Sequence, residues 1–332
     1  MDIGLALPQF DFSVPGEQQL RWDTVLHWAT RAEALGFHSV WLADHLFFSI
    51  EKYGGPPGEH GVFDPIVALG ALARATSRVR LGTLVLCAQL RPPVVLAKAL
   101  ATLDVVSEGR VTVGLGAGWY EPEYVAAGIA FERPGVRLAQ LAEVVQIVKR
   151  LLAGDEVTFR GRHYQVNGAR VRPPARQRPR PPIWVGGKGD ALLRLCAAHA
   201  DGWNTVWSWT FDAYRRRAAV LDVACERAGR DPTAVARSLG LFALVGETPT
   251  DLARRYERLQ RLTPPGVLGH VPLAEWRQGR LVGTVEEVRE QLDRWGALGV
   301  STLVVGAGAI PFVVAGPDDV EMLAAACSLV AP

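Results

Sequence analysis

Residues 80–118 read RLGTLVLCAQLRPPVVLAKALATLDVVSEGRVTVGLGAG, and their pattern of apolar residues indicates the fold class. It opens within a β-rich run, Val79–Leu86, continues with helical spacing over Val94–Val106, and ends in a second apolar run, Val111–Leu115. Short apolar runs without alternation are typical of strands that are buried on both faces of a parallel sheet. The stretch therefore predicts one strand–helix–strand unit.

The same rhythm runs through the whole chain. The predicted strands are Ile3–Leu7, Ser39–Ala43, Val79–Leu86, Val111–Leu115, Ile183–Val185, Gly202–Val206, Leu239–Val245 and Thr302–Val305. Helical patterns lie between them, for example Gln18–Leu35 and Pro65–Thr76, and a last one covers Asp318–Leu329. Eight strand–helix units predict an α/β fold, a single (β/α)8 barrel domain over residues 1–332. An open doubly wound sheet is the alternative, but eight units favour closure.

Two stretches interrupt this rhythm and are predicted to be insertions. Residues 154–182 follow the fourth strand and its helix, and contain a predicted hairpin around Thr158–Tyr164 and a segment rich in proline and arginine. Residues 264–281 lie between the seventh and eighth strands. Insertions of this size in barrels tend to be lids or interface segments.

Composition excludes several classes of protein. The formal net charge is +2, which argues against a nucleic-acid coat or a membrane-surface protein that depends on gross charge. The four cysteines are scattered, without CxxC spacing, which is typical of free thiols in a reducing compartment. With no signal peptide and no apolar run of about 18 residues, we expect a cytoplasmic protein without membrane contact.

The sharpest functional candidate is the pair Asp44-His45. Residues just past each strand line the active-site mouth of a parallel barrel, and this pair follows the second strand. Because the pKa of histidine lies near neutrality, His45 is a candidate general acid or base. The alternative is a hydrogen-bonded structural pair that caps the strand.

Glycines follow the fourth and fifth strands. The spacing G-x-G-x-G over Gly114–Gly118 is not the dinucleotide fingerprint, but it allows backbone to approach a planar ligand, with Trp119 and Tyr120 as pocket wall. Gly186-Gly187-Lys188 precedes a helix, an arrangement that suits a phosphate. The alternative for Trp119 and Tyr120 is packing against the next helix. The alternative for Gly186-Gly187-Lys188 is an ordinary strand-to-helix turn.

Two further candidates are aromatic or thiol side chains. Trp207 and Trp209 follow the sixth strand and suggest an aromatic substrate pocket, although buried indoles often serve only as core. Cys87 follows the third strand, and we interpret it as a small wall residue. The sequence contains neither HExxH nor another metal-ligand spacing, so we expect no metal.

Taken together, these segments resemble the luciferase-like monooxygenase superfamily, and in particular its branch of oxidoreductases that depend on coenzyme F420. The matching segments are ALGFHSVWLADH (34–45), RLGT (80–83) through Lys98, ATLD (101–104), SEGR (107–110), GLGAGW (114–119), PIWVGG (182–187), ADGWN (200–204) and LVGTVEEV (281–288). They cover nearly the whole chain in order.

The resemblance implies a barrel, usually a homodimer or higher homo-oligomer, that holds a flavin or deazaflavin across the strand ends. It implies a non-prolyl cis peptide around Leu84-Val85, ring contacts from Asp44 and Cys87, and a cofactor phosphate at Gly186 and Gly187. His45 matches the catalytic histidine of F420-dependent sugar-phosphate dehydrogenases. Those enzymes place a glutamate proton donor where this chain has Trp119, so their specific activity is not carried over.

Three functions follow as hypotheses. The first is hydride transfer between F420 and a small organic substrate, with arginines 170, 172, 176, 178 and 180 either attracting the acidic tail of the cofactor or facing water. The second is an FMN-dependent monooxygenase that receives reduced flavin from a partner reductase and uses oxygen. The third is a cofactor-binding barrel that has lost catalysis.

Overall fold

The central feature of the computed structural model, which describes residues 1–329, is a closed sheet of eight parallel strands. The barrel strands are β1 (Asp2–Ala6), β2 (Ser39–Leu42), β3 (Arg80–Thr83), β5 (Val111–Gly116), β8 (Ile183–Gly186), β9 (Gly202–Thr205), β10 (Ala236–Gly246) and β12 (Thr302–Gly306). Each pairs with the next in this order, and β12 returns to β1, so the eight strands form a closed ring. The predicted (β/α)8 barrel is confirmed; residues 330–332 of the predicted domain lie outside the described part.

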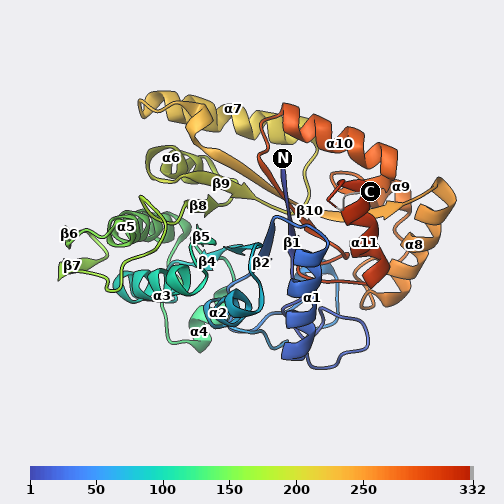
Figure 1. Cartoon of the computed structure of the whole chain (residues 1–332), viewed down its shortest axis with the longest axis horizontal. Helices are drawn as coiled ribbons and strands as arrows, with labels where there is room; N and C mark the ends of the chain where they lie inside the picture. Colours follow the sequence, from blue (N-terminus) through green and yellow to red (C-terminus); the bar gives the residue numbers. More distant parts are fainter. Residues whose placement is uncertain (330–332) are drawn as a thin grey trace.

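Helices surround the strands, as Figure 1 shows. They are α1 (Trp22–Ala34), α2 (Pro65–Ala75), α3 (Pro93–Val106), α4 (Glu121–Ala126), α5 (Pro134–Ala153), α6 (Asp190–His199), α7 (Phe211–Arg227), α8 (Pro249–Leu262), α9 (Leu273–Trp276), α10 (Val285–Ala297) and α11 (Pro317–Ala326), with 3-10 turns η1 (Glu51–Tyr53) and η2 (Pro232–Ala234). Local signals set several of their starts. Asp64 caps α2 ahead of Pro65, and Thr284 and Glu287 form a capping box at α10.

Some predicted boundaries are wrong. The run Val79–Leu86 divides into β3 and a separate short strand, β4 (Leu86–Cys87), and the Leu84–Val85 peptide between them is cis, as the resemblance implies. Helix α1 begins at Trp22 rather than Gln18, because the carboxylate of Asp11 accepts a hydrogen bond from the Leu20 N–H and holds that segment outside the helix.

The two insertions differ in structure. The first contains the predicted hairpin, formed by β6 (Val157–Arg160) and β7 (Gln165–Ala169), which projects at the left edge of Figure 1. The second contains α9, and directly after it β11 (Leu281–Thr284) adds a parallel strand beside β10, outside the barrel ring.

Two tryptophans fill the inside of the barrel. The indoles of Trp41 on β2 and Trp184 on β8 stack with centroids 5.4 Å apart. A glycine faces each on a neighbouring strand: Gly82 is paired with Trp41, and Gly202 with Trp184. A Cβ atom on Gly82 would lie 2.2 Å from the Trp41 ring. These glycines therefore provide the space that the indoles occupy.

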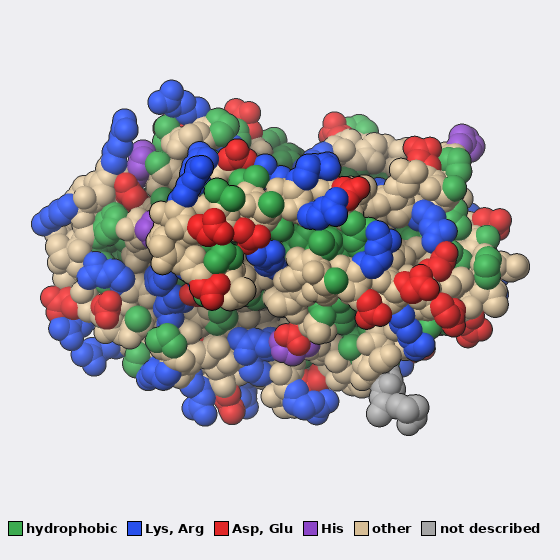
Figure 2. Space-filling model, turned by 90° about the horizontal axis from the view of Figure 1, so that it is seen from above, with side chains coloured by type: hydrophobic (Ala, Val, Ile, Leu, Met, Phe, Trp, Pro, Cys, Tyr) green, Lys and Arg blue, Asp and Glu red, His purple; other side chains and the backbone are tan. Residues whose placement is uncertain are grey.

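The outer surface shows no strong bias in charge on the face seen in Figure 2, where basic and acidic side chains are interspersed. Within residues 1–329, no helix combines the length and the apolar character needed to cross a membrane.

We predict that Gly82→Ala destabilises the barrel, because the added methyl group collides with the Trp41 indole. Overpacking of this kind costs about 1–3 kcal/mol, measured as the free energy of unfolding in urea. Gly135→Ala is the matched control, since a Cβ at this position in α5 meets no atom within 4 Å. A Gly82→Ala variant as stable as the control would contradict the proposed packing.

Candidate active site

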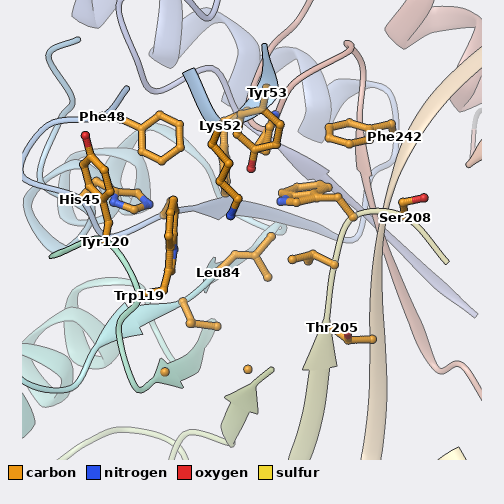
Figure 3. A pocket seen from close by; sticks show the side chains of 18 of the residues that line it. His45, Phe48, Lys52, Tyr53, Leu84, Trp119, Tyr120, Thr205, Ser208 and Phe242 are labelled. Carbon is orange, nitrogen blue, oxygen red and sulfur yellow. The ribbon is translucent and has the colours of Figure 1, made fainter. Parts of the chain in front are cut away.

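A pocket opens at the C-terminal ends of the barrel strands, the end at which barrels of this type carry their sites. Its volume is about 720 Å³. The wall comes from the loops that follow β2, β3, β5, β8 and β9, from Phe242 on β10, and from the second insertion. Figure 3 shows His45, Phe48, Trp119 and Tyr120 on one side and Thr205, Ser208 and Phe242 on the other.

Asp44 lines the pocket, but its carboxylate is committed to the protein. Its side chain is 1% exposed, and its two oxygens accept hydrogen bonds from both terminal nitrogens of Arg91, at 2.6 and 3.0 Å. It also accepts one from the Cys87 N–H at 2.9 Å. Arg91 reaches on to Asp64, the cap of α2. Asp44 therefore ties the exit of β2 to β4 and to the starts of two helices.

His45 has a different partner from its neighbour. Its Nδ1 lies 2.5 Å from the Oε1 of Glu123, whose side chain is only 3% exposed. Burial raises the pKa of Glu123, and the hydrogen bond with His45 opposes that effect. Asp44 and His45 are thus not a hydrogen-bonded pair. Glu123 instead fixes the imidazole through Nδ1. The other ring nitrogen, Nε2, has no protein partner within residues 1–329.

Aromatic rings surround His45 and form one side of the pocket. Its ring centroid lies 4.8 Å from that of Phe48, 5.8 Å from that of Trp119 and 6.3 Å from that of Tyr120. The Trp119 side chain is 46% exposed, an unusual value for an indole, and its exposed face borders the open pocket.

Of the two tryptophans predicted beyond the sixth strand, only one lines the pocket. Trp207 contributes to the wall and stacks on Phe242 at 5.3 Å. Trp209 is 6% exposed and packs edge-on against Trp203 and Tyr214 in the core. The prediction that Trp209 lines the pocket is wrong, because its indole turns behind the wall.

Leu84 and Val85 line the pocket, and Figure 3 shows Leu84 near its middle. Glycines make room for Val85: a Cβ on Gly114, Gly116 or Gly186 would lie within 3 Å of its side chain. The first role of Gly114 and Gly116, on the fourth barrel strand, is therefore to leave space for the Val85 side chain.

Gly118 and Cys87 lie side by side in the wall. The Cys87 thiol is 2.8 Å from the hydroxyl of Tyr124, and burial raises its pKa. Gly118 has a φ of +67°, and a Cβ there would collide with that hydroxyl. The thiol is thus a wall group, as its sequence context indicates, and not an activated nucleophile.

Gly186, Gly187 and Lys188 form the part of the wall that leads into α6. The residue before this helix is Gly189, which has no side chain, so no side chain caps the first N–H groups of α6. Uncapped N–H groups at a helix N-terminus favour an anion.

The arginines of the first insertion lie away from the pocket. The side chain of Arg180 pairs with Asp201, which precedes β9 and so marks the opposite end of the barrel. Arginines 170, 172, 176 and 178 are exposed, and none of the five is among the pocket residues. Their position away from the pocket favours the alternative, in which the side chains of arginines 170, 172, 176 and 178 face water.

Sequence reasoning missed several residues of the site, among them Glu123 and Thr205. Glu123 lies on α4, a short helix that was not predicted, although Glu121-Pro122-Glu123 after a glycine-rich strand exit is a helix-start signal. Thr205 ends β9 and lines the pocket, and its buried hydroxyl has no hydrogen-bond partner among the described residues. No group of three or more His, Cys, Asp and Glu side chains within residues 1–329 could hold a metal.

We predict that Asp44→Ala lowers the free energy of unfolding by about 3–5 kcal/mol, because it leaves Arg91 partly buried without its main partner. Urea unfolding measures this loss. Arg31→Ala breaks an exposed pair with Glu321 and should cost less than about 1 kcal/mol. Equal losses in the two variants would contradict the central role of Asp44.

Comparison with known proteins places the chain among characterised oxidoreductases. It is 30% identical over 315 residues to the F420-dependent hydroxymycolic acid dehydrogenase of Mycobacterium tuberculosis, covering 92% of this chain and 82% of that protein. It is 34% identical over 208 residues to an F420-dependent glucose-6-phosphate dehydrogenase of Microbacterium testaceum, covering 62% of this chain and 59% of that protein.

Solved structures agree on the fold. A monooxygenase from Streptomyces bottropensis superposes with a TM-score of 0.73 at 27% identity, over 99% of this chain and 97% of that one. An F420-dependent secondary alcohol dehydrogenase in complex with an F420–acetone adduct gives 0.77 at 21% identity, over 100% and 99%. The profile of the luciferase-like monooxygenase family matches residues 1–302. The chain therefore belongs to the luciferase-like monooxygenase family.

Proposed function

We propose that the protein is an F420-dependent oxidoreductase that transfers hydride between the deazaflavin and a small organic substrate. The observation that carries the proposal is the His45–Glu123 pair, which holds an imidazole at the wall of an aromatic pocket at the strand ends. Two F420-dependent dehydrogenases among the relatives support the choice of cofactor.

The residues present fit such a cofactor. The apolar side chains of Leu84 and Val85 offer a surface for a planar ring. The buried, unpartnered hydroxyl of Thr205 is a hydrogen-bonding group for the ring edge. Lys188 and the uncapped start of α6 would hold the phosphate, with Gly186 and Gly187 beside it. Asp44, Cys87 and Gly118 would complete the wall beside the ring.

When bound, the deazaflavin supplies the hydride acceptor or donor. The protein orients the substrate against the ring and excludes water with its aromatic wall. Glu123 accepts a hydrogen bond from the His45 Nδ1–H, and Nε2 then takes or gives the proton that accompanies hydride transfer. Trp119, Tyr120 and Trp207 form the substrate side of the pocket.

One observation favours a second candidate, an FMN-dependent monooxygenase supplied by a partner reductase. The solved monooxygenase from Streptomyces bottropensis is 27% identical over nearly the full length of both chains. In that function His45 would serve as the proton donor or acceptor for oxygen chemistry at the same place.

We also propose that the protein works in the cytoplasm as a homodimer or larger homo-oligomer. The support is the family membership together with the scattered free cysteines, three of which are buried. Light scattering of the purified chain measures the oligomeric state, and a monomer would contradict this part.

Side-by-side fluorescence titrations of the purified chain with F420 and FMN test the cofactor. We expect F420 to bind with a micromolar or lower dissociation constant and FMN to bind more weakly. Thr205→Val should weaken F420 binding about two- to tenfold, because it removes one neutral hydrogen bond. Thr30→Val on the exposed face of α1 is the control and should leave the affinity unchanged.

The reverse preference would assign the protein to the FMN-dependent group. Binding of neither cofactor would contradict both functions and leave the non-catalytic barrel.

Turnover tests His45 and Glu123, with the first substrate that changes the F420 absorbance in a screen. We expect His45→Ala to lower kcat about a hundredfold or more and to leave F420 affinity intact. Because burial raises the pKa of Glu123, turnover should fall as the pH drops through that raised pKa and the carboxylate is lost. Glu123→Gln should turn over at least about tenfold more slowly, without that acid limb.

His27→Ala is the control for the loss of an imidazole, because the His27 side chain lies on the exposed face of α1. Full activity of His45→Ala would contradict the role assigned to His45. An unchanged acid limb in Glu123→Gln would remove Glu123 from the mechanism.

A further inference from the structure

Lys52 is a cation that the proposed chemistry does not use. It lies in η1, after the exit of β2, and lines the pocket. Its Nζ lies 3.7 Å from the centroid of the Trp119 ring and 5.7 Å from that of Tyr53. In Figure 3 its side chain runs into the middle of the pocket, with Trp119 on one side and Phe242 on the other.

No carboxylate of residues 1–329 neutralises this ammonium group. Within residues 1–329 Lys52 forms no ion pair, while the two buried acids of the same wall, Asp44 and Glu123, are already bound to Arg91 and His45. Partial burial lowers the pKa of Lys52, and no acidic group offsets it.

A second cation faces the same space. Lys188 also forms no ion pair within the described chain, and its pKa is lowered by partial burial and by the charge of Lys52. Its Nζ lies over Trp209, 4.6 Å from the ring centroid. Two ammonium groups that repel each other across an aromatic pocket favour a negatively charged ligand between or beside them.

The position of Lys52 connects this charge to the substrate. The Trp119 indole separates the Lys52 ammonium from the His45 imidazole, and it contacts both. A molecule whose anionic group binds Lys52 would therefore extend past the edge of this indole to bring its reacting carbon to His45. Contact with the indole stabilises the ammonium only in part, and its N–H donors remain free for a charge-assisted hydrogen bond.

We propose that Lys52 is a specificity residue, whose ammonium binds a carboxylate or phosphate of the organic substrate. The organic substrate is accordingly an anion, with its reacting carbon held toward His45 and its negative charge held by Lys52. The inference rests on the proposed function only in naming this anion a substrate.

Calorimetric titration with two probes of the same ring size tests the proposal: 2-naphthoate, which carries a carboxylate, and 2-naphthamide, which is neutral. The full chain is used, saturated with whichever of F420 or FMN binds, or alone if neither does. We expect the wild type to bind 2-naphthoate about tenfold or more tightly than 2-naphthamide. Lys52→Met should lower the affinity for 2-naphthoate by about the same factor and change that for 2-naphthamide less than about twofold.

Two variants serve as controls. Lys52→Arg keeps the charge and should retain the preference for the carboxylate. Arg160→Met removes one positive charge from the exposed hairpin and should leave both affinities unchanged.

Three results would overturn the proposal. The first is a wild type that does not prefer 2-naphthoate, absence of binding included. The second is a Lys52→Met variant that loses both probes equally, which would make Lys52 a packing residue. The third is a Lys52→Met variant that loses F420 or FMN affinity but keeps 2-naphthoate, which would assign the anion to the cofactor. Failure of both cofactors to bind would refute the proposed function and leave the probe result standing.

Discussion

The stack of Trp41 on Trp184 packs two large side chains from opposite parts of the sheet against each other inside the barrel. An eight-stranded barrel is just wide enough for its interior to be filled by side chains. Here two indoles with centroids 5.4 Å apart fill part of that space, and the glycines that face them let them fit. The pocket lies at the strand ends, where the apolar side chains of Leu84 and Val85 line it.

At those ends, two adjacent residues have opposite tasks. Asp44 is nearly unexposed and bound bidentately by Arg91, so its charge is used to hold β2, β4 and the neighbouring helices together. His45 projects into the aromatic pocket and depends on one buried carboxylate, that of Glu123. A buried carboxylate that loses its hydrogen-bond partner is costly, and the hydrogen bond between Glu123 and His45 thereby keeps the imidazole in place. At this strand exit, Asp44 therefore stabilises the fold, whereas its neighbour His45 is available for the proposed chemistry.

Most of the barrel could be predicted from the sequence, because buried parallel strands leave continuous apolar runs such as Val111–Leu115 that need no tertiary information. Glu123 could not be found in this way, since its importance comes from a contact with His45, which lies far away in the sequence. Thr205 is the last residue of β9, and Trp209 lies four residues later in the loop. The direction of each side chain decides which one lines the pocket. No hydrophobic pattern encodes that direction in a loop.

The two insertions show how such a barrel divides stability from specificity. The first begins and ends near the N-terminal ends of the strands, where Arg180 binds Asp201 and Asp104 accepts hydrogen bonds from the backbone of Arg176 and Gln177. The second reaches the pocket through α9 and its flanking loops. Contacts at the strand starts bear on folding alone, whereas side chains at the strand ends can change without affecting the closed sheet. Lys52 is a side chain of the strand ends, because it lies in η1 after β2, forms no ion pair among residues 1–329, and projects into the pocket.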